Sequence, residues 1–231
     1  MKKMLSVLII VILPSYAFAL IGFGLQFGSD LSKLGSQSYT EGSGDLVFNV
    51  NSYEMESNPV GGGGYAFLDL FGFALEGEFD VAFGEYEFDF GNENMDYDPI
   101  PFRWARASYA ATFKKNIMDL SIPFLAKAAV NAGGGFGGHV STPRANVEMV
   151  RELFGDDLIN LNVSSEDLED DLVSYLKDNA IEANGLHLQA GLRFKVLVLD
   201  THLNARYNLA KNVYDGKNGF LQLIFKMGFA F

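Results

Sequence analysis

The chain has 231 residues, which suits one domain or at most two small ones, and it carries 17 basic against 29 acidic side chains. With a formal charge of −12 it offers no obvious basic face, so we expect no nucleic-acid partner. The absence of cysteine excludes disulfide scaffolds, thiolate metal sites and a cysteine-linked lipid anchor. Beyond the N-terminus, no apolar run is long enough for a membrane-spanning helix.

The first 19 residues have the three-part layout of a secretory signal peptide. Lys2 and Lys3 precede an apolar run over 4–13, and Ala-Phe-Ala at 17–19 supplies the small residues of a cleavage site. An apolar run of about ten residues is too short for a retained membrane anchor. We therefore expect removal of residues 1–19 on export, which leaves 15 basic and 29 acidic side chains and a formal charge of −14.

After this leader, apolar and polar residues alternate with the period of a β-strand. In 199–209, for example, Leu203 and Tyr207 share one face, whereas Asp200 and Arg206 share the other. Eight segments follow the pattern: 20–28, 62–71, 73–90, 101–113, 118–137, 185–197, 199–209 and 219–231. A strand of about ten residues tilted by ~45° rises ~23 Å, which is close to the apolar band of an outer-membrane barrel.

The connections between these segments alternate in length. Long links are predicted at 28–61, 91–100, 138–184 and 210–218, and short turns near Phe71-Gly72, at Lys114 to Asn116 and at Val198. Outer-membrane barrels have short periplasmic turns and longer extracellular loops, whereas a soluble meander has no reason to alternate so regularly. A ten-stranded barrel that uses Asp45 to Met55 in an extra hairpin remains a second possibility.

One face of the strands is nearly all Leu, Phe, Val and Ala, and the other carries charges of both signs. Such a charged face suits the lumen of a barrel in lipid, where opposite charges can pair. The predicted lumen network consists of Glu76, Glu78, Asp80, Lys127, His187, Arg193, Lys195, Asp200, His202, Arg206 and Lys226. These side chains would form either a plug of salt bridges or a narrow gated path for ions or water. Trp104, Tyr109 and Phe113 are expected in the outward apolar girdle, near strand ends.

This pattern resembles the small eight-stranded outer-membrane barrels of Gram-negative-type bacteria, the group of OmpA-type transmembrane domains and OmpX-like proteins. The resemblance spans 20–231 and is most specific in the last strand, where one face reads Leu223, Phe225, Met227, Phe229 and Phe231. It implies an all-β, antiparallel up-and-down transmembrane β-barrel in the bacterial outer membrane. It also implies that outer-membrane lipids, periplasmic chaperones and the outer-membrane barrel assembly machinery are partners, the last strand serving as the assembly signal. No peptidoglycan-binding domain follows and the third long loop is unusually large, so the function of one member is not transferred.

The third extracellular loop, 138–184, is predicted to be partly helical. Thr142 and Pro143 would begin a first helix that Gly155 ends, and Ser164 or Ser165 would begin a second. The apolar positions are Val147, Val150 and Phe154 in the first helix and Leu168, Leu172, Tyr175 and Leu176 in the second. We expect the two helices to pack on each other or to cap the barrel mouth. The opposite face of the second helix carries Glu166, Asp167, Glu169, Asp170 and Asp171, which either stabilise the helix or bind an extracellular ligand such as a divalent cation or a basic partner.

Candidate catalytic and metal-binding groups are few. The stretch 92–98 places oxygens at alternate positions but lacks the glycine and glutamate of a calcium loop. The glycine runs at 61–64 and 133–135 do not have the context of a phosphate-binding loop and are expected to permit curvature or close packing. His139 and Ser141 lie at a strand-to-loop rim, but their spacing shows neither a contact nor an orienting acid.

The sequence therefore predicts a barrel without a metal or cofactor and without enzymatic activity. Its expected role is structural, or one of surface interaction, in the cell envelope. A channel or small-solute transporter gated by interior salt bridges is the main alternative, and a lipid-modifying barrel enzyme is a further one.

Overall fold

The computed structural model describes residues 21–231 except 43–46, 71, 93–94, 123–124 and 155–164, so the predicted signal peptide lies outside the described residues. The strands are β1 (Ile21–Asp30), β2 (Gln37–Glu41), β3 (Phe48–Ser52), β4 (Val60–Leu70), β5 (Phe73–Asn92), β6 (Met95–Asp96), β7 (Ile100–Ile122), β8 (Ala126–Ser141), β9 (Ile181–Val196), β10 (Leu199–Leu209) and β11 (Phe220–Ala230). The helices are α2 (Val147–Phe154) and α3 (Ser165–Asp178). Neither described helix has the length and apolar character needed to cross a membrane.

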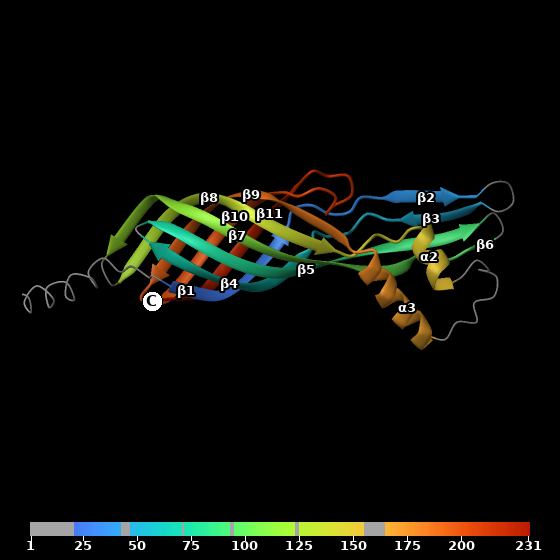
Figure 1. Cartoon of the computed structure of the whole chain (residues 1–231), viewed down its shortest axis with the longest axis horizontal. Helices are drawn as coiled ribbons and strands as arrows, with labels where there is room; N and C mark the ends of the chain where they lie inside the picture. The colour runs from blue at the N-terminus through green and yellow to red at the C-terminus, as the bar shows by residue number, and fades with distance from the viewer. Residues whose placement is uncertain (1–20, 43–46, 71, 93–94, 123–124, 155–164) are drawn as a thin grey trace, which may run out of the picture.

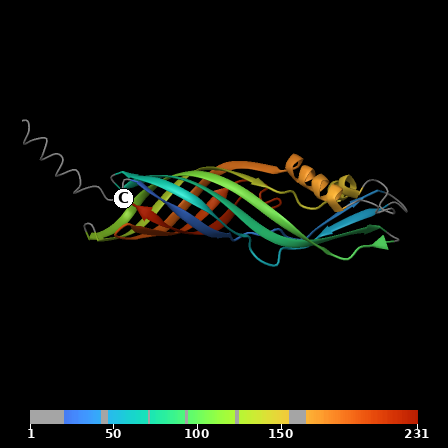
Figure 2. The ribbon, with the colours of Figure 1, turned by 90° about the horizontal axis from the view of Figure 1, so that it is seen from below.

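Eight strands close into an antiparallel ring in the order β1, β4, β5, β7, β8, β9, β10 and β11, and β11 pairs back with β1. This ring confirms the predicted eight-stranded barrel. The short connections and the end of the chain lie at one end of the barrel, which we call the turn end (Figure 1). The opposite end, the loop end, carries β2, β3, β6 and both helices (Figure 2).

The long link 28–61 contains the hairpin β2–β3, which lies outside the ring. β3 pairs with β5 from Phe88 to Asn92, whereas β4 pairs with the same side of β5 only as far as Phe83. β5 therefore leaves the barrel and continues into a sheet at the loop end. The ten-strand alternative is wrong, because the hairpin lengthens this sheet and does not widen the barrel.

The turn predicted at Lys114 to Asn116 is also wrong. β7 continues to Ile122 and stays paired with β8 across an irregularity between Asn116 and Met118. Lys114 is buried in the barrel, whereas Met118 and Leu120 point outward. Because the interior of the barrel is polar, an inward-facing strand position can carry a charged residue such as Lys114. In the sequence, such a residue resembles part of a turn. The predicted link 91–100 is shortened as well, since β6 pairs with the end of β5.

The side-chain pattern of β5 reverses at Gly84. Before this residue the outward side chains are apolar, as at Phe79, and the buried ones include acids, as at Glu78. After it the exposed positions become acidic, as at Glu87, and the buried ones become aromatic, as at Phe88. The barrel thus has an apolar exterior and a charged interior, whereas the loop end has the charged exterior and apolar core of a water-soluble domain.

The side-chain pattern of β7 reverses at the same level of the barrel, because Gly84 pairs with Trp104 and Glu85 with Arg103. Arg103 is exposed and Trp104 is buried, at 1% exposure, in the core of the loop end. The prediction that Trp104 belongs to the outward girdle is therefore wrong. Tyr109 and Phe113 do point outward, but from the middle of β7 and not from near its ends.

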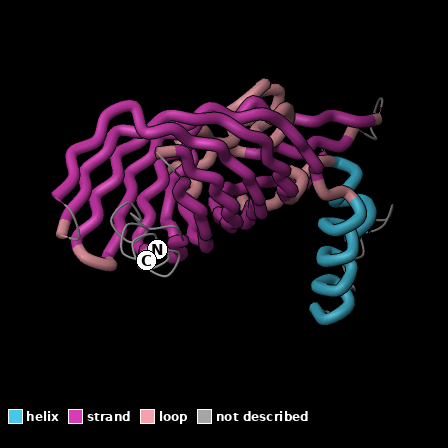
Figure 3. Tube along the Cα trace, turned by 60° about the vertical axis from the view of Figure 1, so that its left-hand side comes forward, coloured by secondary structure: helices cyan, strands magenta, loops and turns pink. Residues whose placement is uncertain are grey.

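The two helices pack on each other at the loop end (Figure 3). α2 also contacts β2 and β3, and side chains of both helices join the apolar core there. α2 begins later than predicted: Thr142 still extends the β7–β8 pairing through its N–H, which donates to Ala105 O at 2.9 Å. Asn146 caps the helix instead, since its Oδ1 accepts a hydrogen bond from Met149 N at 2.9 Å. Gly155 and Ser164 lie outside the described residues, and α3 begins at Ser165.

The predicted acidic face of α3 is only partly described. Asp170 and Asp171 are exposed, while the side chains of Glu166, Asp167 and Glu169 lie outside the described part of the chain. Ligand or cation binding at this face stays a prediction.

The glycine runs lie where neighbouring strands approach closely. A Cβ atom on Gly63 would come within 1.9 Å of Phe79 O, and one on Gly135 within 1.8 Å of Ala111 O. No side chain fits at either distance. These glycines permit the close packing of neighbouring strands in a narrow barrel.

Candidate functional site: the ionic interior of the barrel

Three groups of charged side chains follow one another along the interior. The turn-end cluster is centred on Arg193, which donates to Asp69 Oδ2 at 2.6 Å and to Asp200 Oδ2 at 2.6 Å. Lys127 Nζ lies 3.6 Å from Asp69, and His202 Nε2 lies 3.5 Å from Asp200. One guanidinium thus holds two carboxylates that come from β4 and β10, on different parts of the ring.

The central cluster is centred on Lys226 of β11, which has no exposed surface. Its ammonium lies 2.8 Å from Glu76 and 2.5 Å from Glu78, both on β5. Lys114 donates to the other oxygen of Glu76 at 2.7 Å, and Arg206 forms an ion pair with Glu78. Both carboxylates are therefore held by two cations each, which is what stable burial of charge requires.

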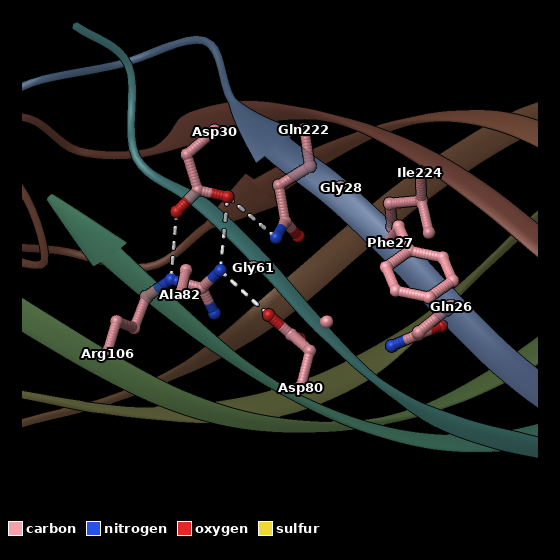
Figure 4. Close-up of a pocket in the computed structure, with 11 residues that line it drawn as sticks. Gln26, Phe27, Gly28, Asp30, Gly61, Asp80, Ala82, Arg106, Gln222 and Ile224 are labelled. Carbon is pink, nitrogen blue, oxygen red and sulfur yellow. Dashed lines mark hydrogen bonds and ion pairs between the residues drawn. The ribbon is translucent and has the colours of Figure 1, made fainter.

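The loop-end cluster is centred on Arg106, whose guanidinium lies 2.9 Å from both Asp30 and Asp80 (Figure 4). Gln222 donates to Asp30 at 2.8 Å, and the Tyr214 hydroxyl also donates to Asp30. The cavity beside these residues has a volume of about 10 Å³, which is near the lower limit for one water molecule.

Aromatic side chains cover the interior at the loop end. The rings of Trp104 and Tyr214 are 4.9 Å apart, and those of Tyr214 and Phe220 are 5.3 Å apart. Phe220 in turn lies over Arg106, with 5.4 Å between the guanidinium carbon and the ring centroid. We call Trp104, Tyr214 and Phe220 the aromatic lid. Packed rings thus lie over Arg106 of the loop-end cluster, and the Asp80 side chain of this cluster is 16% exposed.

The three clusters balance in charge. They contain six acids and six bases: Asp30, Asp69, Glu76, Glu78, Asp80 and Asp200 with Arg106, Lys114, Lys127, Arg193, Arg206 and Lys226. The whole chain has a formal charge of −12, so its acidic excess lies outside these clusters. An interior of paired charges suits a plug, because each ion has a fixed partner.

No protein-family model and no curated protein matches the chain. Solved structures with a similar fold include Ail, the attachment invasion locus protein of Yersinia pestis, in complex with the heparin analogue sucrose octasulfate (12% identity, 91% of this chain and 97% of that chain, TM-score 0.43). Ail in a phospholipid bilayer nanodisc also matches (14% identity, 90% and 99% coverage, TM-score 0.37). So does the β domain of the Bordetella autotransporter BrkA (8% identity, 92% and 100% coverage, TM-score 0.31). Identities and TM-scores this low assign neither a family nor a ligand to this chain.

Most residues of the predicted lumen network lie in these clusters. Ten of the predicted side chains point into the barrel and have a polar contact there: Glu76, Glu78, Asp80, Lys127, His187, Arg193, Asp200, His202, Arg206 and Lys226. His187 contacts a hydroxyl and no ion, since its Nε2 lies 2.9 Å from Thr112 Oγ1. Lys195 is partly exposed and belongs to none of the three clusters.

The predicted network lacks four members of the clusters: Asp30, Asp69, Arg106 and Lys114. Strand parity could have found two of them. Asp69 lies between the outward residues Leu68 and Leu70, and Arg106 shares its face with Trp104, opposite Tyr109. A strand cannot present Trp104 and Tyr109 on the same face, so placing Tyr109 outward already implies that Trp104 and Arg106 point inward.

His139 and Ser141 do not form a pair. His139 Nδ1 lies 2.7 Å from Ser108 Oγ, which also accepts a hydrogen bond from Arg106, and the imidazole packs against Phe220. Ser141 Oγ is buried and has no hydrogen-bond partner among the described residues. No three metal-ligating side chains are grouped together in the described part of the chain.

The residues of the predicted assembly signal line the outside of the barrel. Leu223, Phe225, Met227 and Phe229 point outward from β11, and Phe231 follows the end of that strand. They continue the apolar exterior across the pair of strands that closes the ring.

Proposed function

We propose that the protein is an integral barrel of the bacterial outer membrane with a structural or surface-interaction role. The apolar exterior carries this proposal. All eight strands of the ring expose large apolar side chains, among them Phe23, Leu68, Phe79, Phe113, Phe136, Leu188, Leu203 and Phe225. Soluble monomers rarely expose apolar patches larger than a few hundred Å². Such a surface is suited to contact with the hydrocarbon core of a lipid bilayer.

The reversal at Gly84 supports the same placement. From Phe73 to Phe83 the exposed residues of β5 are apolar, and ten steps of ~3.3 Å tilted by ~45° rise ~23 Å. This rise is close to the apolar band of an outer-membrane barrel. We place the loop end outside the cell and the turn end in the periplasm, which requires export by a signal peptide such as 1–19.

The proposed partners follow from this placement. Outer-membrane lipids would cover the apolar exterior. Periplasmic chaperones and the barrel assembly machinery would handle the chain before insertion, and the outward face of β11 is the proposed recognition element. We assign the protein no catalytic role, because His139 is buried in the barrel interior, where it contacts Ser108 and packs against Phe220.

The interior favours a plug over a channel, which planar-bilayer recording can test. We expect no conductance steps from the purified full chain, because paired charges fill the barrel and the aromatic lid covers its loop end. Glu78→Ala should leave the bilayer silent as well, since it removes two contacts in the central cluster but leaves the lid in place. Regular steps from the wild type would support the channel instead, and steps from Glu78→Ala alone would show a path gated by this charge.

A further inference from the structure

A polar cleft lies at the loop end, outside the barrel interior. Its volume is about 440 Å³, within the range of ~300–1,000 Å³ for small-molecule sites. The walls come from the segment after β1, the segment before β4, the connection between β10 and β11, and Arg144. Hydroxyl and amide groups contribute to the lining, including Ser32, Ser36, Gln37 and Asn58. Such walls suit a hydrophilic ligand.

Arg144 is the unusual member of this lining. Its side chain is only 4% exposed, and one Nη atom forms an ion pair with Asp215. Its Nε and its other Nη atom have no hydrogen-bond acceptor among the described residues. A guanidinium offers five N–H donors in a planar fork that matches carboxylate and phosphate oxygens. Arg144 therefore has unused capacity to bind an anionic group.

Two lysines add positive charge at the same place. Lys217 Nζ donates to the backbone carbonyl of Lys33 at 3.3 Å, and Lys33 Nζ lies 2.8 Å from Glu54. The Lys33 ammonium lowers the pKa of Glu54, which is therefore ionised at neutral pH. With Arg144, Lys33 and Lys217 against Asp215 and Glu54, the lining carries one net positive charge. This is a local exception in a chain of formal charge −12.

We infer that this cleft binds a hydroxyl-rich small molecule with one carboxylate or phosphate group, such as a sugar acid or a sugar phosphate. Arg144 binds the anionic group, the lysines add charge, and the hydroxyls and amides of the lining bind the hydroxyl groups of the ligand. The same chemistry can come from a free solute or from a glycolipid of the outer leaflet. Only this question of source rests on the proposed outer-membrane placement.

Calorimetric titration of the full chain in phospholipid nanodiscs tests the inference. We expect glucuronate and glucose 6-phosphate to bind, and glucose to bind at least about tenfold more weakly. Lys217→Gln and Lys33→Gln should each weaken binding of the anionic probes about fivefold. Arg144→Gln should abolish it, but this variant leaves Asp215 without its partner and can fail to fold, so the exposed lysines carry the test.

Lys211→Gln is the matched control, because Lys211 is an exposed lysine of the same connection that does not line the cleft. It should bind like the wild type. Weaker probe binding in nanodiscs that contain lipopolysaccharide would identify the glycolipid as the source, and unchanged binding would identify a free solute. The inference is overturned if neither anionic probe binds, if glucose binds equally well, or if Lys211→Gln weakens binding as much as Lys217→Gln. If the protein still shows heat-modifiable gel mobility in any of these cases, the barrel is folded, so the inference about the cleft fails and the proposed function stands.

Discussion

Lys226→Met is expected to destabilise the folded barrel by about 3–5 kcal/mol, because it removes one partner from a buried ionic cluster. Lys226 is fully buried and bridges Glu76 and Glu78, at 2.8 and 2.5 Å. Without the ammonium, Lys114 and Arg206 are left with one carboxylate each, and the two acids repel each other inside the barrel. Urea unfolding in phospholipid vesicles, followed by heat-modifiable gel mobility, measures the loss.

Lys115→Met is the control for this variant, since it makes the same chemical change at an exposed residue of β7. Lys115 lies over the ring of Phe73 at 5.5 Å, so its loss should cost less than about 1 kcal/mol. Glu78→Gln added to Lys226→Met should restore part of the stability, because it ends the repulsion between the two carboxylates and leaves five acids and five bases in the three clusters. Equal stability of the two single variants would show that the central cluster does not hold the barrel together.

Phe79→Arg is expected to cost about 2–4 kcal/mol, the cost of an arginine at the middle of the bilayer on the lipid face of a barrel. Phe79 points outward from β5 and is 62% exposed. In water, replacing such an exposed phenylalanine by arginine would be neutral or would improve solubility. Unfolding in phospholipid vesicles therefore separates the two environments by the size of the effect.

Glu87→Arg is the matched control on the same strand. Glu87 is exposed too, but it lies beyond the reversal at Gly84. We expect this substitution to change the free energy of unfolding by no more than about 0.5 kcal/mol. Small and similar effects at both positions would mean that Phe79 faces water, which contradicts the proposed placement of the barrel.

The alternation of side chains is enough to predict the strands of the ring. In β10 and β11 every second residue points outward, and the burial of these strands follows the sequence pattern without interruption. Alternation shows that a segment is a strand, but it does not identify its neighbour. The sequence therefore leaves open whether the β2–β3 hairpin belongs to the barrel, although in the structure it pairs with the loop-end part of β5.

Each error in the predicted site has a physical cause. In a barrel with a polar interior, a charged residue does not mark the end of a strand, so Lys114 resembles a turn residue although it holds Glu76 inside. An aromatic residue such as Trp104 is expected on the lipid face, but the alternation along β7 places Trp104 on the inward face. Arg106, two residues further along the strand, shares that face. Contacts such as that of Arg106 with Asp30 join residues 76 positions apart, and only the closed ring brings them together.

Arg144 has no sequence signal at all. It lies in the segment between β8 and α2, where no period of side chains applies, and its partner Asp215 lies in the connection between β10 and β11. The cleft is built by four segments that are distant in the sequence, so only the folded loop end shows it.

Site-directed spin labelling along β5 tests the central claim most directly, because the natural chain has no cysteine and each label is unique. Single cysteines would replace Leu75, Phe79, Phe83, Glu85 and Glu87, which are all exposed. In phospholipid bilayers, we expect labels at 75, 79 and 83 to be relaxed by oxygen and shielded from a water-soluble nickel complex, and labels at 85 and 87 to show the reverse. Access of the nickel complex to all five labels would contradict the account.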